Sequence, residues 1–135
     1  MSTLKVSTIQ DTSGNNSSTP NEVAQGRAKA WISFNAIPST PVISDSFNVS
    51  SITDHAQGDH TINFANAMAN ADYVMVGTLD NYEGTAGDSY GIIAGQSNDP
   101  LTTTGFRVTT LRAKFNLNPP QLKDFGHVMC VVFGD

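Results

Sequence analysis

The sequence contains little charge, and positive charge is missing from the middle of the chain. Charged residues make up 14% of the 135 residues, and neither Lys nor Arg occurs between positions 30 and 106. The carboxylates in that stretch are Asp45, Asp54, Asp59, Asp72, Asp80, Glu83, Asp88 and Asp99, and the formal net charge of the chain is −5. Proteins that bind nucleic acid need a basic stripe that displaces counterions, and binding to an anionic membrane surface needs one too. We therefore expect no nucleic-acid partner.

Cysteines and long apolar runs are also scarce. Cys130 is the only cysteine and lies in the apolar run 128–133, so an intrachain disulfide is impossible and a small core residue is expected. No stretch approaches the roughly 20 apolar residues that span a bilayer, and the first residues lack the charged and apolar regions of a signal peptide. We expect no membrane insertion and synthesis in a cytoplasm without an export signal.

In place of charged residues and long apolar runs, the sequence contains mainly Ser, Thr, Asn and Gly. This composition is typical of β-rich modules. From position 28 onward, short β-compatible runs alternate with turn signals, and no long amphipathic helix is indicated. The sequence predicts an all-β fold, a small antiparallel β-sandwich or barrel-like domain, over residues 28–135. The predicted strands are 28–35, 47–52, 61–64, 73–77, 90–93, 102–115 and 126–133.

Three of these segments carry sharper expectations. Segment 73–77 is a continuous apolar run, which predicts a strand buried on both faces. Segment 54–59, with Gly58, is predicted to be a hairpin loop. Strand 126–133 is apolar on both faces and could form an open edge, which another element or another subunit would have to cover.

Residues 1–27 are predicted to form a separate N-terminal segment with three parts. Residues 4–9 alternate apolar and polar side chains, as a half-buried strand does. Residues 11–19 are polar and predict an extended linker without sheet pairing. Thr19, Pro20 and Glu22 have the spacing of a capping box, which predicts one short helical turn over residues 20–25.

The residue types needed for catalysis are present, but not in a catalytic arrangement. His55, His60 and His127 lie outside any recognisable catalytic string, and His55 and His60 are interpreted as surface residues beside the predicted loop. Paired carboxylates can hydrolyse glycans, but such enzymes line a long groove with aromatic rings, and this chain has one Trp and three Tyr. The acidic loop 80–88 lacks the alternating spacing that wraps Ca²⁺. We expect no enzyme activity, no catalytic residues, no cofactor and no metal site.

The same acidic loop is the best candidate for contact with a receptor. Aromatic rings beside carboxylate and amide groups suit sugar recognition. The predicted receptor-contact residues are Asp80, Asn81, Tyr82, Glu83, Asp88, Tyr90, His55 and Asp59. Because the acidic middle of the chain repels anionic surfaces, we expect a neutral sugar, a protein loop or a bridging divalent cation at this contact.

Several strings, taken in order, carry a resemblance to a known group of proteins. They are residues 2–10 (STLKVSTIQ) followed by 12–14 (TSG), 26–35 (GRAKAWISFN), 45–54 (DSFNVSSITD) with 58–59 (GD), 67–74 (AMANADYV) and 131–134 (VVFG). Together they resemble phage tail-fibre and virion appendage proteins, especially fibre-like proteins of marine cyanobacterial phages.

The resemblance implies a homotrimeric virion protein, made in the host cytoplasm, whose β-domain contacts a host-surface glycan or protein. Residues 1–27 would attach it to other virion proteins or support trimerisation. The predicted trimer interface contains Trp31, Phe34, Val131 and Phe133. One alternative is a capsid or tail decoration or adaptor protein that binds only other virion proteins. A soluble sugar-binding lectin from a cell fits the β-domain but not the opening residues.

Overall fold

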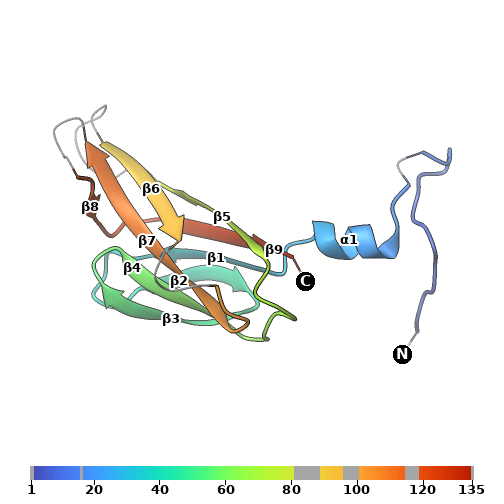
Figure 1. Cartoon of the computed structure of the whole chain (residues 1–135), viewed down its shortest axis with the longest axis horizontal. Coiled ribbons are helices and arrows are strands. Elements are labelled where there is room, and N and C mark those ends of the chain that lie inside the picture. The colour runs from blue at the N-terminus through green and yellow to red at the C-terminus, as the bar shows by residue number, and fades with distance from the viewer. Residues whose placement is uncertain (1, 16, 81–88, 96–100, 115–118, 135) are drawn as a thin grey trace.

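Two antiparallel sheets packed face to face form the main body of the protein (Figure 1). The computed structural model describes residues 2–15, 17–80, 89–95, 101–114 and 119–134. Within these ranges the chain contains one short helix and nine strands, and all strand pairs are antiparallel. The predicted all-β sandwich is confirmed.

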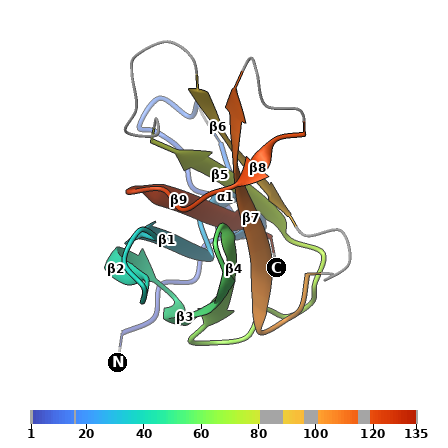
Figure 2. The ribbon, with the colours of Figure 1, turned by 90° about the vertical axis from the view of Figure 1, so that its left-hand side faces the viewer.

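The two sheets have different strand orders, and Figure 2 shows both layers from one end. The first sheet has the order β2 (Val42–Phe47), β1 (Ala30–Asn35), β9 (Val128–Phe133) and β5 (Val74–Leu79). The second has the order β3 (Val49–Ala56), β4 (Asp59–Phe64), β7 (Gly105–Lys114) and β6 (Ser89–Gly95), with β8 (Gln121–Leu122) also paired to β7.

The core lies between the sheets and follows from alternation along the strands. In β1, Ile32 and Phe34 point inward and are fully buried, while the residues between them are only partly covered. Cys130 on β9 lies opposite Ile32 and is also buried, which confirms it as a core residue. Burial in this apolar layer raises the pKa of the Cys130 thiol to about 12, so it stays protonated at neutral pH.

The strand order, which sequence alone does not give, decides one open alternative and overturns one prediction. Cover of β9 by another element or by another subunit was expected, and β9 pairs with β1 on one side and β5 on the other, so other elements of the chain cover it. β5 is not buried on both faces, since it forms an edge of its sheet and exposes Val74 and Val76. An apolar run in this sequence can therefore be a central strand, as β9 is, or an edge strand with one exposed face, as β5 is.

The turn between β3 and β4 is tighter than the predicted loop 54–59. β3 continues to Ala56 and β4 begins at Asp59, which leaves only Gln57 and Gly58 in the turn. Gly58 has a φ of +68°, and a Cβ there would lie 2.5 Å from the carbonyl oxygen of Thr110. Only glycine satisfies both the backbone conformation and the space.

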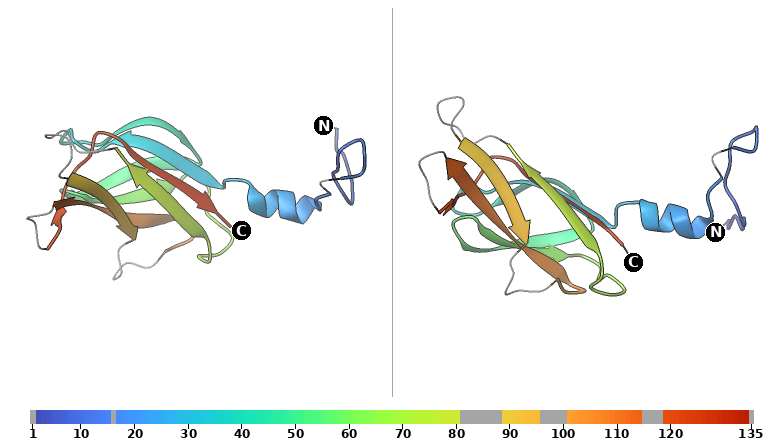
Figure 3. Two further views of the ribbon diagram at one scale, coloured as in Figure 1. Left: turned by 90° about the horizontal axis from the view of Figure 1, so that it is seen from above. Right: turned by 45° about the horizontal axis from the view of Figure 1, so that its top comes forward.

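The N-terminal residues project from the sandwich as an arm that contains helix α1 (Pro20–Gly26), as Figures 1 and 3 show. The predicted capping box is confirmed: the Glu22 amide donates to Thr19 Oγ1 at 3.2 Å, and the Thr19 amide donates to the Glu22 carboxylate at 2.6 Å.

The rest of the arm differs from the prediction. The described part of residues 11–19 is not extended throughout, because Asp11 accepts from the amides of Ser13 and Asn15 and turns the chain back. This turn lets Ile9 pair with Ser18 in an isolated bridge. Residues 4–9 form no strand beyond that bridge, and their side chains are exposed in the single chain.

Candidate functional site

The outer surface of the β2-β1-β9-β5 sheet is apolar, although it faces away from the core. Alternation along the four strands places one set of side chains on this surface, and eight of them are apolar. We call these residues the apolar face: Val42, Phe47, Trp31, Val131, Val76, Phe133, Val74 and Met129.

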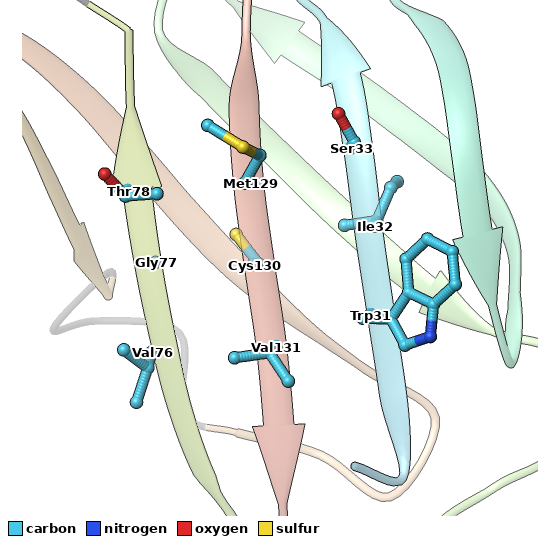
Figure 4. A pocket seen from close by; sticks show the side chains of 9 residues that line it. All are labelled: Trp31, Ile32, Ser33, Val76, Gly77, Thr78, Met129, Cys130 and Val131. Carbon is cyan, nitrogen blue, oxygen red and sulfur yellow. The ribbon is translucent and has the colours of Figure 1, made fainter.

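Cross-strand register aligns four of these side chains in one row across the whole sheet. Trp31 is the direct partner of Phe47 on β2 and of Val131 on β9, and Val131 is the partner of Val76 on β5. Figure 4 shows Trp31, Val131 and Val76 on three neighbouring strands, with Ser33, Met129 and Thr78 in the next row. Directly opposed aromatic and β-branched side chains form a continuous apolar strip.

Much of the apolar face is uncovered in the single chain. The exposed fraction is 61% for Val74, 53% for Val76 and 52% for Phe47. A shallow hollow of about 280 Å³ lies over the strip between Trp31 and Val76. Contiguous exposed apolar surface of this kind is rare on monomers and usually marks a contact with another molecule.

The predicted interface residues fall on both sides of this sheet. Trp31, Val131 and Phe133 lie on the apolar face and are half-buried. Phe34 does not belong with them, because alternation along β1 turns its side chain inward, where it is fully buried in the core of one chain. Phe34 is therefore removed from the predicted interface.

The outer surface of the second sheet has the opposite character. Side chains from β3 and β4 form a polar ladder, in which the Asn63 amide donates to the hydroxyls of Ser51 at 3.1 Å and Thr53 at 3.0 Å. In the same ladder, a ring nitrogen of His55 lies 2.9 Å from Thr61 Oγ1. The two outer surfaces are thus chemically distinct. Polar side chains hydrogen-bond to one another on the second sheet, whereas the outer surface of the first sheet is apolar.

One predicted receptor residue of the second sheet is engaged within the chain. Asp59 is buried and accepts two hydrogen bonds from Arg107, Nε to Oδ1 at 2.7 Å and Nη2 to Oδ2 at 2.6 Å. The guanidinium holds the pKa of the Asp59 carboxyl below its usual value. Both carboxylate oxygens of Asp59 are thus taken by a cation of its own chain, and its role as a receptor contact stays a prediction.

The other predicted receptor residues are not assembled into one site. His55 is exposed on β3, and Asp80 follows β5 in the other sheet, where its carboxylate lies 3.0 Å from His127 Nδ1. Tyr90 belongs to β6. Asn81, Tyr82, Glu83 and Asp88 lie outside the described residues.

His60 was expected at the surface, and that prediction was wrong. Its side chain is 1% exposed, its ring packs edge-on against Phe34, and Nε2 lies 3.7 Å from Asp54 and 3.9 Å from Asp124. Burial lowers the pKa of His60, and the two carboxylates oppose that effect without reversing it. The imidazole is neutral at pH 7 and acts as part of the core.

The described residues contain no group of three or more His, Cys, Asp or Glu side chains that could hold a metal ion. Among the helices that the structure describes, none is long and apolar enough to cross a membrane. Besides the apolar face, the described surface has a second hollow, whose lining includes two cations.

The second hollow lies at the end of the sandwich where α1 leads into β1. It has a volume of about 420 Å³ and is lined by Arg27, Lys29, Phe47, Asn48, Ala65 and Asn66. Phe47 is shared with the apolar face, so the two features adjoin. Asn48 has a positive φ of 55°, and its side chain ties together the three segments that form the hollow.

The sequence prediction missed most of this surface. Met129 lies in strand 126–133, where cover by another subunit was one expectation, but Phe47, Val74 and Val76 had no special signal, because apolar residues in strands are normally assigned to a core. The useful signal is positional: once 73–77 is placed at a sheet edge, alternate residues must face outward. The hollow had no sequence signal, since its residues come from three distant segments.

Comparison of the chain with models of protein families, with curated proteins and with solved structures gives no match. The site must therefore be judged on its own geometry.

Proposed function

We propose that this chain is a non-enzymatic structural protein of a virion, a module of a homotrimeric phage fibre or fibre tip that contacts the host surface. The observation that carries the proposal is the apolar face, a row of apolar side chains across four strands that a single chain leaves open. Removing such a surface from water is the main driving force for association between folded chains.

If a second copy of the chain covers a surface of this protein, the charge distribution favours this face for the contact. Two copies that each carry a net charge of −5 repel one another unless the contacting surfaces avoid carboxylates. Among the outward-facing positions of β2, β1, β9 and β5, all of them described, Asp45 at the β2 edge is the only charged residue. The apolar face is thus the surface by which acidic copies approach at the lowest electrostatic cost.

The arm supports the part of the proposal that concerns attachment. Leu4 and Ile9 are 85% and 50% exposed, and the helix that follows projects from the sandwich (Figure 3). Apolar side chains on a projecting segment gain free energy when another protein covers them. Residues 1–27 therefore attach the module to other virion proteins or join the arms of the trimer.

Contact with the host is expected on a surface that the trimer leaves free. The polar ladder of the second sheet and the predicted loop 80–89 are the candidates, and most of that loop lies outside the described residues. The excess of carboxylates in residues 30–106 favours a neutral glycan or a protein as the receptor, or a divalent cation that bridges two anionic surfaces.

A second candidate, a decoration or adaptor protein, rests on the same face. An uncharged sheet surface can be covered by another virion protein as well as by a second copy. In that case the isolated chain leaves the face open and remains a monomer.

Light scattering of the purified full chain separates the two candidates. The fibre proposal predicts a mass of three times 14.3 kDa that is stable on dilution, and the adaptor predicts 14.3 kDa. Immunogold labelling of phage particles then tests location. Label at fibre tips supports the first function, label over the capsid or tail body supports the second, and unlabelled particles contradict both.

A further inference from the structure

We propose that the hollow formed by Arg27, Lys29, Phe47, Asn48, Ala65 and Asn66 is a binding site for a carboxylated sugar, such as a uronic acid unit of an acidic polysaccharide. This site adjoins the proposed trimer contact through Phe47 and lies apart from the predicted receptor loops. It lies at the end of the sandwich, where β2 passes into β3 and the α1–β1 link arrives (Figure 1).

Two cations supply the charge that a carboxylate needs. Arg27 and Lys29 lie in the link between α1, which ends at Gly26, and β1, which begins at Ala30. Both residues line the hollow. Within the described ranges, neither side chain has a carboxylate within ion-pair distance. Their charge is therefore available to a ligand.

The local charge of the hollow opposes that of the whole chain. The lining residues carry two positive charges and no negative one, whereas the chain has a net charge of −5. The acidic stretch begins only after position 30, so the two cations that precede it create a local positive region. Screening confines the long-range repulsion from other carboxylates to about 8 Å at physiological salt, and a bound anion responds mainly to the nearest charges.

The hollow is also held in shape before any ligand arrives. Asn48 Nδ2 donates to the carbonyl oxygens of Lys29 and Asn66, both at 3.1 Å, and Asn48 Oδ1 accepts from the Asn66 amide at 2.8 Å. These bonds fix Asn48 in a left-handed conformation that costs free energy for a residue other than glycine. A preformed site loses less entropy on binding than one that must be ordered.

The remaining groups indicate a sugar rather than a simple anion. The volume of about 420 Å³ falls within the roughly 300–1,000 Å³ typical of small-molecule sites. Phe47 offers a half-exposed ring, on which the apolar face of a pyranose can stack. The guanidinium of Arg27 matches a carboxylate in shape and charge, with Lys29 as a second donor. The side-chain amide of Asn66 donates to Asn48 Oδ1 at 3.1 Å, so this polar lining residue is held in place before a ligand binds.

The test is an NMR titration of the isotope-labelled full chain with sodium glucuronate at constant ionic strength. Glucuronate should shift the amide signals of Ala28, Lys29, Asn48 and Asn66, and the signals should saturate. Glucose, which lacks the carboxylate, and acetate, which lacks the ring, should each bind at least roughly tenfold more weakly. Equal shifts with acetate would show an adventitious anion only, and no shift with glucuronate would also overturn the proposal.

Matched variants connect the signal to the two cations. R27Q and K29Q should each weaken glucuronate binding roughly tenfold, because each removes one charge-assisted contact. K5Q removes the same charge from the arm and should leave the affinity unchanged. If K5Q weakens binding as much as K29Q, the effect is general electrostatics and the site is wrong. If R27Q or K29Q instead changes the mass of the assembly, a neighbouring copy occupies the hollow, and the sugar proposal fails while the trimer stands.

Discussion

The carboxylate of Asp59 and the guanidinium of Arg107 form a two-point pair between neighbouring strands, with N–O distances of 2.7 and 2.6 Å. Arg107 is the first basic residue after the stretch that lacks Lys and Arg, so a cation from its margin neutralises a carboxylate from within it. The side chain of Arg107 is only 24% exposed and that of Asp59 only 12%. The pair therefore acts as part of the structure and reduces the negative charge presented by β4.

The pair predicts an acid-dependent loss of stability. Because the folded-state pKa of Asp59 is lowered, the pair contributes fully above the unfolded value near 3.8 and is lost as the pH falls through the folded pKa. D59N should lower the free energy of unfolding at pH 7 by about 1–2 kcal/mol, and its stability should fall less steeply in acid. Urea unfolding at a series of pH values from 7 to 2.5 measures the free energy of unfolding and its dependence on pH. D45N, at an exposed position, is the control and should change neither quantity.

His60 predicts a second pH effect in a higher window. Burial lowers its folded-state pKa below the usual 6.5 while Asp54, Asp124 and Asp59 oppose the shift and His55 adds to it. The contribution of neutral His60 to stability is therefore fully present above pH 6.5. It is lost as the pH falls through the folded-state pKa of His60. H60N should remove this part of the pH dependence, whereas H55N should keep it. An NMR titration in which His60 protonates at or above pH 6.5 would contradict the prediction.

The β3–β4 turn predicts a strong effect of one methyl group. In G58A the new Cβ meets the Thr110 carbonyl oxygen at 2.5 Å and the Lys123 amide nitrogen at 2.6 Å, at a φ of +68°. The free energy of unfolding should fall by about 2–4 kcal/mol. G95A is the control, since no atom lies within 4 Å of a Cβ there. Chemical denaturation of the two variants gives the comparison, and equal stabilities would contradict it.

The fold class was predictable because local signals agreed with one another. Alternation in β1, turn residues such as Gly58, and the Thr19–Glu22 capping box each act within a few residues of sequence. Strand order was not predictable, because it depends on which strands meet across the sheet. This is why the sequence left open what covers strand 126–133 and wrongly predicted that 73–77 is buried on both faces.

The same limit explains the errors at individual residues. Asp59 and His60 are neighbours in a polar stretch, which suggests a surface loop, yet the strand turns one toward Arg107 and the other into the core. Arg107, the partner of Asp59, and Asp124, one of the two carboxylates near His60, lie more than 40 residues away in sequence. Long-range pairing of this kind leaves no mark in composition or periodicity.

The apolar face predicts that one charge will break the assembly without unfolding the chain. Val76 is 53% exposed at the end of the apolar row, so V76K adds a cation to that row without touching the core. Covering an unpaired ammonium with a second copy costs about 3–5 kcal/mol, so light scattering should fall from three times 14.3 kDa to 14.3 kDa. T53K places the same charge on the polar ladder of the other sheet, and its mass should not change.

Thermal unfolding must show that both variants remain folded, because Lys in the solvent-facing row of a strand costs little by itself. A folded V76K that keeps the trimer mass would show that the copies meet through another surface. Loss of the trimer in V76K alone would identify the β2-β1-β9-β5 sheet as the contact.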